Sequence, residues 1–143
     1  MIFGNGGSAA IASHFSVDLT KNARVRCTNY NESDLLTCFS NDYGYENIFS
    51  RQAQALASEN DSLIVYSTSG KSPNIIKLVK EARNNVKYII SFTGSNKNDL
   101  AEYSDVVLSV NSDKTTRIQE IHAIAGHIIC ECVEETLFGH MKN

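Results

Sequence analysis

The sequence predicts an α/β fold built around a mostly parallel sheet. Segments with the pattern of buried strands alternate with segments of helical pattern along the whole chain, an order that produces parallel strands joined by helices. The clearest strand, residues 63–66 (LIVY), is a continuous apolar run, as expected of a strand covered on both faces. The 143 residues suffice for one domain with a hydrophobic core. We therefore expect a single domain over residues 1–143, with its ligand at the carboxyl ends of the strands.

Two strands and three helices are expected before this central strand. Residues 1–3 form the end of a strand, residues 8–20 form a helix, and residues 24–28 (RVRCT) form a second strand. Two further helices at 32–40 and 43–57 flank a turn at 41–44 (NDYG). Crossover helices of this kind are what parallel strands require.

Two strands and three helices follow it. Ser72 suits the N-cap and Pro73 the first position of a helix that ends near Asn84. Residues 86–94 and 105–110 form the last two strands, with a short helix near Leu100 between them. The final helix, at 116–138, carries an apolar stripe at helical spacing that consists of Ile118, Ile121, Ala125, Ile128 or Ile129, and Cys132.

Composition excludes several classes of protein. The net charge is -3 without a basic cluster, so a nucleic-acid surface is not favoured. No apolar run reaches the roughly 18 to 20 residues that span a bilayer, and no signal sequence precedes the fold; we expect a cytoplasmic protein without a membrane partner. The four cysteines form no C-x-x-C pair and are expected to be buried, reduced thiols: Cys27, Cys38, Cys130 and Cys132.

The segment GNGGSA at 4–9 formally matches the dinucleotide fingerprint G-x-G-x-x-A. Its glycines let the backbone approach an anion, and the following helix offers N–H groups. A dinucleotide site also needs an acidic residue after the second strand, and Thr28, Asn29 and Tyr30 stand there. A nucleotide and a plain strand-to-helix turn remain open, and a different polar ligand is favoured.

Four hydroxyl residues surround Gly70 directly before the helix that Pro73 starts: Ser67, Thr68, Ser69 and Ser72. Hydroxyls beside a helix N-terminus bind phosphate without needing a cation. A P-loop would need glycine five positions before Gly70, where Val65 stands, so that motif is excluded. The alternative to a phosphate site is a serine-rich capped turn.

Two helices carry polar pairs suited to catalysis. His14 and Asp18 are four residues apart and share a helix face, so they can share a metal ion or a proton. Gln119 and His127, eight apart on the last helix, also roughly share a face. A single histidine is more often a surface residue or a satisfied polar one, but the two pairs together form a candidate active site.

Four segments, GNGGSAAIASHF, NDYGYENIFSRQ, STSGKSPN and RIQEIHAIAGHIICECVEE, stand in an order and spacing that resembles the phosphoheptose isomerases. These sugar-isomerase-type (SIS) domain enzymes convert sedoheptulose 7-phosphate into D-glycero-D-manno-heptose 7-phosphate. The resemblance covers essentially the whole chain. It implies a flavodoxin-like three-layer α-β-α sandwich with five parallel strands, a homotetramer with active sites between subunits, and bound zinc.

The resemblance also implies a role for each site residue. Those that bind the sugar phosphate would be Asn5, Gly6, Gly7, Asp18, Asn41, Asp42, Ser67, Thr68, Ser69, Ser72 and Gln119. The metal ligands would be His14, Asp18, Gln119 and His127. Asp18 would act as base and His127 as acid, or the two would exchange roles. His122 matches no role in the family.

The chain departs from the family in two places. The family has glutamate where this chain has Asp18, which withdraws the carboxylate by about one C–C bond, a displacement large enough to lower the rate. Family members also have several dozen residues before the glycine loop, including an N-terminal helix, and only residues 1–3 precede it here. The chain is therefore expected to be truncated at its N-terminus.

The expected function is isomerisation of a heptose phosphate through an enediol, the first step in making ADP-heptose or GDP-heptose precursors of lipopolysaccharide or capsule. Zinc would polarise the carbonyl or hold the site together. One alternative is a non-catalytic SIS-domain binding module, like the initiator-associating protein of bacterial replication, which lacks the metal and acid/base histidines. His14, Gln119 and His127 favour the enzyme. Another sugar phosphate as substrate is the second alternative.

Overall fold

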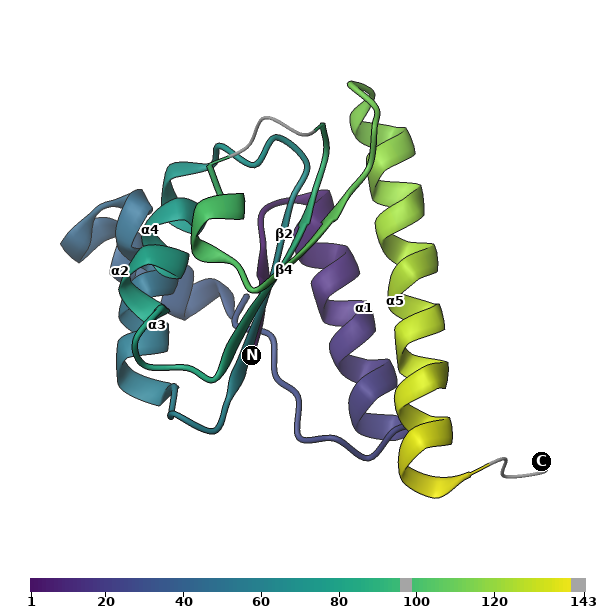
Figure 1. Cartoon of the computed structure of the whole chain (residues 1–143). Coiled ribbons are helices and arrows are strands. Elements are labelled where there is room, and N and C mark those ends of the chain that lie inside the picture. The colour runs from purple at the N-terminus through teal and green to yellow at the C-terminus, as the bar shows by residue number, and fades with distance from the viewer. Residues whose placement is uncertain (96–98, 140–143) are drawn as a thin grey trace.

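The protein is an α/β sandwich of three layers (Figure 1). The computed structural model describes residues 1–95 and 99–139. Helices α1 (Gly7–Lys21) and α5 (Thr115–Phe138) cover one face of the sheet. The other face is covered by α2 (Ser33–Tyr43), α3 (Ile48–Leu56) and α4 (Pro73–Ala82). The predicted fold class is confirmed.

The sheet consists of four parallel strands in the order β1-β2-β3-β4. Their bounds are Ile2–Gly4, Ser62–Ser67, Tyr88–Thr93 and Val106–Ser109. Side chains alternate between its two faces, as the pleat requires. Leu63 and Val65 enter the core under α3 and α4, whereas Tyr66 enters the core under α1 and α5 with Phe92.

The prediction of a strand at 24–28, which would have made the sheet five-stranded, is wrong: these residues form no regular strand. The chain curls back onto the end of α1, because the Val25 amide donates to the Leu19 carbonyl at 2.9 Å and Arg24 adopts a left-handed φ of 53°. It reaches the sheet only afterwards, where the Ile2 amide donates to the Thr28 carbonyl at 3.0 Å. One isolated parallel bridge, from Ile2 to Asn29, therefore occupies the edge beside β1.

The turn expected at 41–44 begins later than the sequence suggested. Helix α2 continues through Asn41 and Asp42 and stops at Gly44, whose φ of 86° few other residues adopt. A short 3₁₀ turn, Tyr45–Asn47, then leads into α3. The helices expected at 32–40 and 43–57 are both present with this boundary moved.

The prediction of the apolar stripe on α5 is partly wrong. Ile118 is buried, but Ile121 and Ile128 are 43% and 54% exposed, and Cys132 is exposed as well. The buried stripe continues instead through His122, Gly126 and Cys130. The helix packs closely on α1 through Gly126, where an added Cβ would meet the Phe15 ring at 3.5 Å, so a small residue rather than a large one marks the contact.

The cysteines were expected to be buried, and this holds for one of them. All four are free thiols. Cys130 is buried and Cys27 is half-buried, whereas Cys38 and Cys132 are exposed. Among the residues that the structure describes, no helix combines the length and apolar character needed to cross a bilayer.

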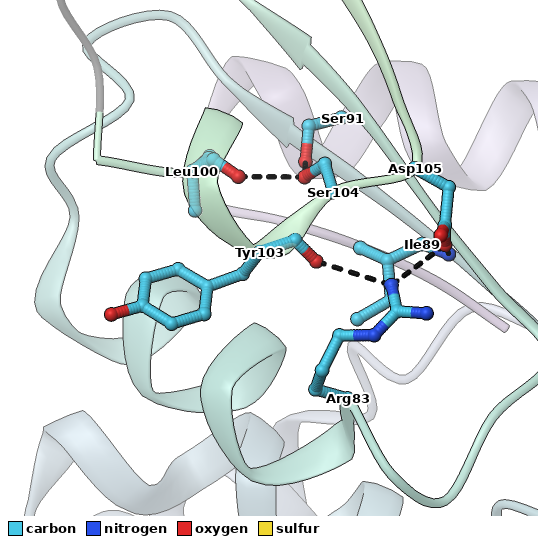
Figure 2. A network of polar contacts seen from close by, with 7 residues as sticks. All are labelled: Arg83, Ile89, Ser91, Leu100, Tyr103, Ser104 and Asp105. Carbon is cyan, nitrogen blue, oxygen red and sulfur yellow. Dashed lines mark hydrogen bonds and ion pairs between the residues drawn. The ribbon is translucent and has the colours of Figure 1, made fainter.

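A polar network fixes the outer strand β4 to β3 (Figure 2). The Asp105 carboxylate accepts hydrogen bonds from the Ile89 amide and the Arg83 guanidinium, both at 2.7 Å. The Ser91 and Ser104 hydroxyls lie 2.6 Å apart. Hydrogen bonding to Arg83 and to the Ile89 amide lowers the pKa of Asp105.

Candidate active site

The carboxyl ends of the strands all lie at one edge of the sheet (Figure 1). The β1–α1 connection carries the glycine loop, and the β2–α4 connection carries the serine-rich loop. This is the edge at which open parallel sheets bind ligands. The glycine loop and the serine-rich loop therefore lie at the edge where the sequence predicts a ligand, and binding there stays a prediction.

Three predicted site residues, His14, Asp18 and His127, meet between α1 and α5. Asp18 Oδ2 lies 3.4 Å from His14 Nε2 and 3.4 Å from His127 Nδ1. The two imidazole rings are 5.1 Å apart and meet edge to face. We call these three residues the His-Asp-His cluster; its three ligand atoms all lie within 4.8 Å of one another.

The cluster opens into a cavity of about 270 Å³ between the two helices. Its other walls are small or apolar residues, among them Ile11, Phe15 and Ala123. The Asp18 side chain is 17% exposed, while both histidines are more than half exposed. The sheltered carboxylate and open imidazoles leave one side of the cluster accessible to a ligand.

The short Asp18 side chain nevertheless reaches both histidines. Its carboxylate oxygen is within ion-pair distance of both rings. The expectation that aspartate in place of glutamate lowers the rate concerns the distance to substrate, and it stays a prediction.

Gln119 lies at the glycine loop. A Cβ added to Gly7 would be 2.5 Å from Gln119 Nε2 and 2.9 Å from Oε1, so the missing side chain of Gly7 leaves room for this amide. Gly7 precedes His14 by seven residues, about 10 Å along the helix. Three of the four predicted metal ligands thus come together, and ligation by Gln119 stays a prediction.

The serine-rich loop forms a compact cradle. Ser67, at the end of β2, and Ser72, the N-cap of α4, bring their hydroxyl oxygens to 3.5 Å of each other. Gly70, with φ 63°, turns the loop back, and its amide donates to the Ser67 carbonyl at 3.1 Å. The Ser72 hydroxyl makes no capping hydrogen bond. It therefore stays available to a ligand at the positive end of the α4 dipole.

Thr68 is the part of the cradle that touches the neighbouring strand. Its carbonyl accepts a hydrogen bond from the Gly94 amide at 3.0 Å, just beyond β3. A Cβ on Gly94 would overlap this carbonyl oxygen. Only glycine lets the two strand ends approach so closely.

The Asn5 side chain, predicted to bind substrate, is already bound to the protein. Its Nδ2 donates to Asn74 Oδ1 at 2.9 Å, and its Oδ1 accepts from Asn74 Nδ2 at 2.9 Å and from the Tyr45 hydroxyl at 3.1 Å. Sequence reasoning missed Asn74 and Tyr45. Asn74 is the last residue of the segment STSGKSPN. An asparagine at the start of a helix does not by itself indicate which side chain it binds.

Comparison with known proteins shows which protein family this chain belongs to. A family model described as the SIS domain matches residues 1–94. The phosphoheptose isomerase of Burkholderia pseudomallei (strain K96243) is 44% identical over an alignment that covers 97% of this chain and 74% of that protein. That of Helicobacter pylori (strain ATCC 700392 / 26695) is 41% identical over 98% of this chain and 76% of the relative. The chain belongs to the phosphoheptose isomerase family.

Solved structures of phosphoheptose isomerases have the same fold. The one from Francisella tularensis superposes with a TM-score of 0.84 at 33% identity, and the one from Neisseria gonorrhoeae with 0.85 at 36% identity. Each comparison covers 94% of this chain and 74% of the other.

Two residues that the phosphoheptose isomerase pattern assigns to the sugar lie apart from the cluster. Asn41 and Asp42 are exposed in the last turn of α2, on the opposite face of the sheet from α1 and α5 (Figure 1). There Asn41 Nδ2 donates to Asp42 Oδ1 at 2.8 Å. Their contact with substrate stays a prediction.

His122, which matches no role in the phosphoheptose isomerase pattern, is fully buried. Its Nε2 lies 3.0 Å from the Thr93 carbonyl oxygen, and its ring packs on Tyr66 and Phe92. Burial lowers the pKa of His122, which favours the neutral imidazole. The residue thus belongs to the core and not to the accessible cluster.

Proposed function

We propose that this chain is a cytoplasmic phosphoheptose isomerase that interconverts sedoheptulose 7-phosphate and D-glycero-D-manno-heptose 7-phosphate. The observation that carries the proposal is the His-Asp-His cluster in a member of this family, where a carboxylate and an imidazole lie 3.4 Å apart beside an open cavity. Moving a proton between adjacent carbons needs such a base and acid.

The phosphate would bind in the serine cradle. Ser67, Ser69 and Ser72 would donate hydroxyl hydrogens, Thr68 would complete the cradle, and the N-terminus of α4 would add a favourable dipole. Anchoring one end of the substrate fixes its carbonyl end relative to the catalytic groups. Such positioning is a large part of the rate that an isomerase gains.

Proton transfer would take place at the carbonyl end. The Asp18 carboxylate removes the proton from the carbon beside the carbonyl, and His127, acting as general acid in its imidazolium form, protonates the carbonyl oxygen, which gives the enediol. Reversal of the two roles collapses the enediol to the other sugar. Each group thereby ends the cycle in the protonation state in which it began.

The cluster also fits a metal ion. Two imidazole nitrogens and a carboxylate oxygen are the ligand types of catalytic zinc sites, which keep one position open. We infer that His14, Asp18 and His127 hold zinc, with Gln119 as the further ligand that the family pattern suggests. Bound zinc would stabilise negative charge that develops on the substrate oxygen.

The decisive experiment is a turnover assay on a panel of ketose phosphates, with and without zinc. We expect isomerisation of sedoheptulose 7-phosphate, lost after chelation and regained with zinc. Failure to isomerise any ketose phosphate in either condition overturns the function. Preference for a different ketose phosphate would replace the substrate and leave the chemistry intact.

A binding measurement tests the metal separately from activity. Zinc that binds the folded chain raises its melting temperature by mass action. We expect this rise for the parent and its loss in His14→Ala. An equal rise in both proteins would contradict the proposed ligand set.

We further propose that the chain assembles as a homotetramer. The outer face of α5 exposes Ile121, Ile124 and Ile128, each between 43% and 54% exposed. These residues are spaced three and four apart, so they form one apolar stripe along the helix. Such a stripe is typical of a surface that another chain covers.

A further inference from the structure

Three segments that are far apart in the sequence meet at Asn5. The Asn5 and Asn74 side chains exchange two hydrogen bonds of 2.9 Å, which join the glycine loop to the first turn of α4. The Tyr45 hydroxyl, from the 3₁₀ turn before α3, donates to the same Asn5 oxygen at 3.1 Å. We call these three residues the amide clasp.

Most of the hydrogen-bonding groups of the amide clasp are paired with one another. Asn5 Oδ1 accepts two hydrogen bonds, so both of its lone pairs are occupied. Asn74 Oδ1 likewise accepts from Asn5 Nδ2 and from the Ile75 amide at 3.0 Å. Asn74 is only 1% exposed, so a lost partner would leave a buried amide unpaired. The amide clasp is therefore expected to keep these three side chains in a single arrangement.

The clasp lies between the two halves of the proposed site. Asn5 is flanked by Gly4 and Gly6, and Gly7, two residues further on, lies against Gln119. Asn74 comes two residues after Ser72 of the phosphate cradle. A displacement of the glycine loop relative to α4 would thus change the separation between the phosphate end and the reacting end.

We propose that Asn74 and Tyr45 are positioning residues that act through Asn5 to fix the glycine loop relative to the phosphate cradle. The inference rests on the proposed isomerase function. Neither residue needs to touch the reacting carbons, since a misplacement of about 1 Å can cost 10²-fold in rate. Among the described residues, the cradle hydroxyls make no hydrogen bond to the clasp, so we expect the cradle to keep its shape without it.

Two variants test the clasp, together with the Ki of inorganic phosphate as a competitive inhibitor. Tyr45→Phe removes one hydroxyl from a half-exposed ring, and we expect kcat to fall about five-fold, as for one neutral hydrogen bond. Asn74→Leu removes both bonds of the amide pair, and we expect a fall of about 10²-fold. The phosphate Ki should stay within about twofold of the parent in both, a result that general damage to the fold would not give.

Two controls make the result specific. Tyr88→Phe removes a hydroxyl from a ring of similar exposure on β3, away from the clasp, and should leave kcat unchanged. In an Asn5→Ala background the hydroxyl of Tyr45 has lost its acceptor. Tyr45→Phe should then have no further effect, because coupled residues do not add.

The outcomes separate this inference from the proposed function. A parent that isomerises ketose phosphates while both clasp variants keep its kcat overturns the positioning role. So does a rise in the phosphate Ki as large as the fall in kcat. A parent with no isomerase activity overturns the proposed function first, and the positioning role with it.

Discussion

Asp18 is the residue on which the proposed chemistry most depends. Its carboxylate oxygen lies equally far from both histidines of the His-Asp-His cluster, so one group can serve as base and as ligand. Helical spacing predicted its pairing with His14 from the sequence. The contact with His127 required the fold, because it joins helices from opposite ends of the chain.

We predict that Asp18→Asn lowers kcat by at least 10²-fold, since an amide cannot take up the proton and general-base catalysis is typically worth 10²- to 10⁴-fold. Steady-state kinetics with saturating zinc measure the loss. Asp18→Glu is the matched control, because it keeps the charge and introduces the residue that the family resemblance implies here, and it should retain most of the activity. An amide variant with the parent rate would rule out the base assignment.

Gly94 supports a second prediction at the same scale. In Gly94→Ala the new methyl group overlaps the Thr68 carbonyl and approaches Ile118 Cδ1 at 2.8 Å. We expect a loss of about 1–3 kcal/mol in the free energy of unfolding, as for overpacked sites, and a raised KM because the cradle moves. Urea unfolding and steady-state kinetics measure the two effects.

Gly126→Ala is the matched control for stability. There the added methyl group meets Phe15 at an ordinary 3.5 Å and alanine favours the helix. The variant should be at least as stable as the parent. Equal losses in both variants would show that the close approach at Gly94 is not the cause.

At the scale of elements, the sequence predicted best where local and tertiary preferences agree. Ser72 and Pro73 begin α4 as predicted, and the apolar run at 63–66 lies within β2. The segment 24–28 has the composition of a strand, but backbone hydrogen bonds to the end of α1 hold its first residues away from the sheet. Such competition between neighbouring elements cannot be recognised from the local pattern of residue types.

The same limit explains the residues that the sequence did not reveal. Histidine and carboxylate types on one helix face predicted the cluster, and hydroxyls before a helix predicted the cradle. The amide clasp joins residues 69 positions apart, and asparagine is common in loops. Its partner could be found only once the topology had placed α4 beside the glycine loop.

The Asp105 network makes a prediction about pH at this scale. Hydrogen bonds from Arg83 and Ile89 lower the pKa of Asp105 in the folded state below the unfolded value of about 3.9. Its contribution to stability is therefore present above that pH and is lost as the pH falls through the folded pKa. Asp105→Asn should thus destabilise the protein near pH 7 and differ less from the parent below about pH 3.

Urea unfolding of both proteins across this range measures the difference. Glu120→Gln, which removes one partner of the exposed Arg117–Glu120 pair on α5, is the control and should change stability little at either pH. A penalty for Asp105→Asn that is independent of pH would contradict the role of the charged carboxylate in holding β4.

For the whole molecule, the exposed isoleucines of α5 predict association. We expect Ile124→Asp to lower the mass in solution from that of a tetramer, since burying an unpaired charge in an apolar contact is strongly unfavourable. Size-exclusion chromatography with light scattering measures it. Leu56→Asp, at a site of similar exposure at the end of α3, should leave the mass unchanged. A parent that is already monomeric would contradict the homotetramer.

The pairing of α1 with α5 also has a consequence for how the activity can be lost. Asp18 and His14 belong to α1 and His127 belongs to α5, whereas the serine cradle belongs to β2, α4 and the loop between them. A change that only loosens the contact between the two helices should therefore separate the acid from the base and leave the phosphate cradle in place.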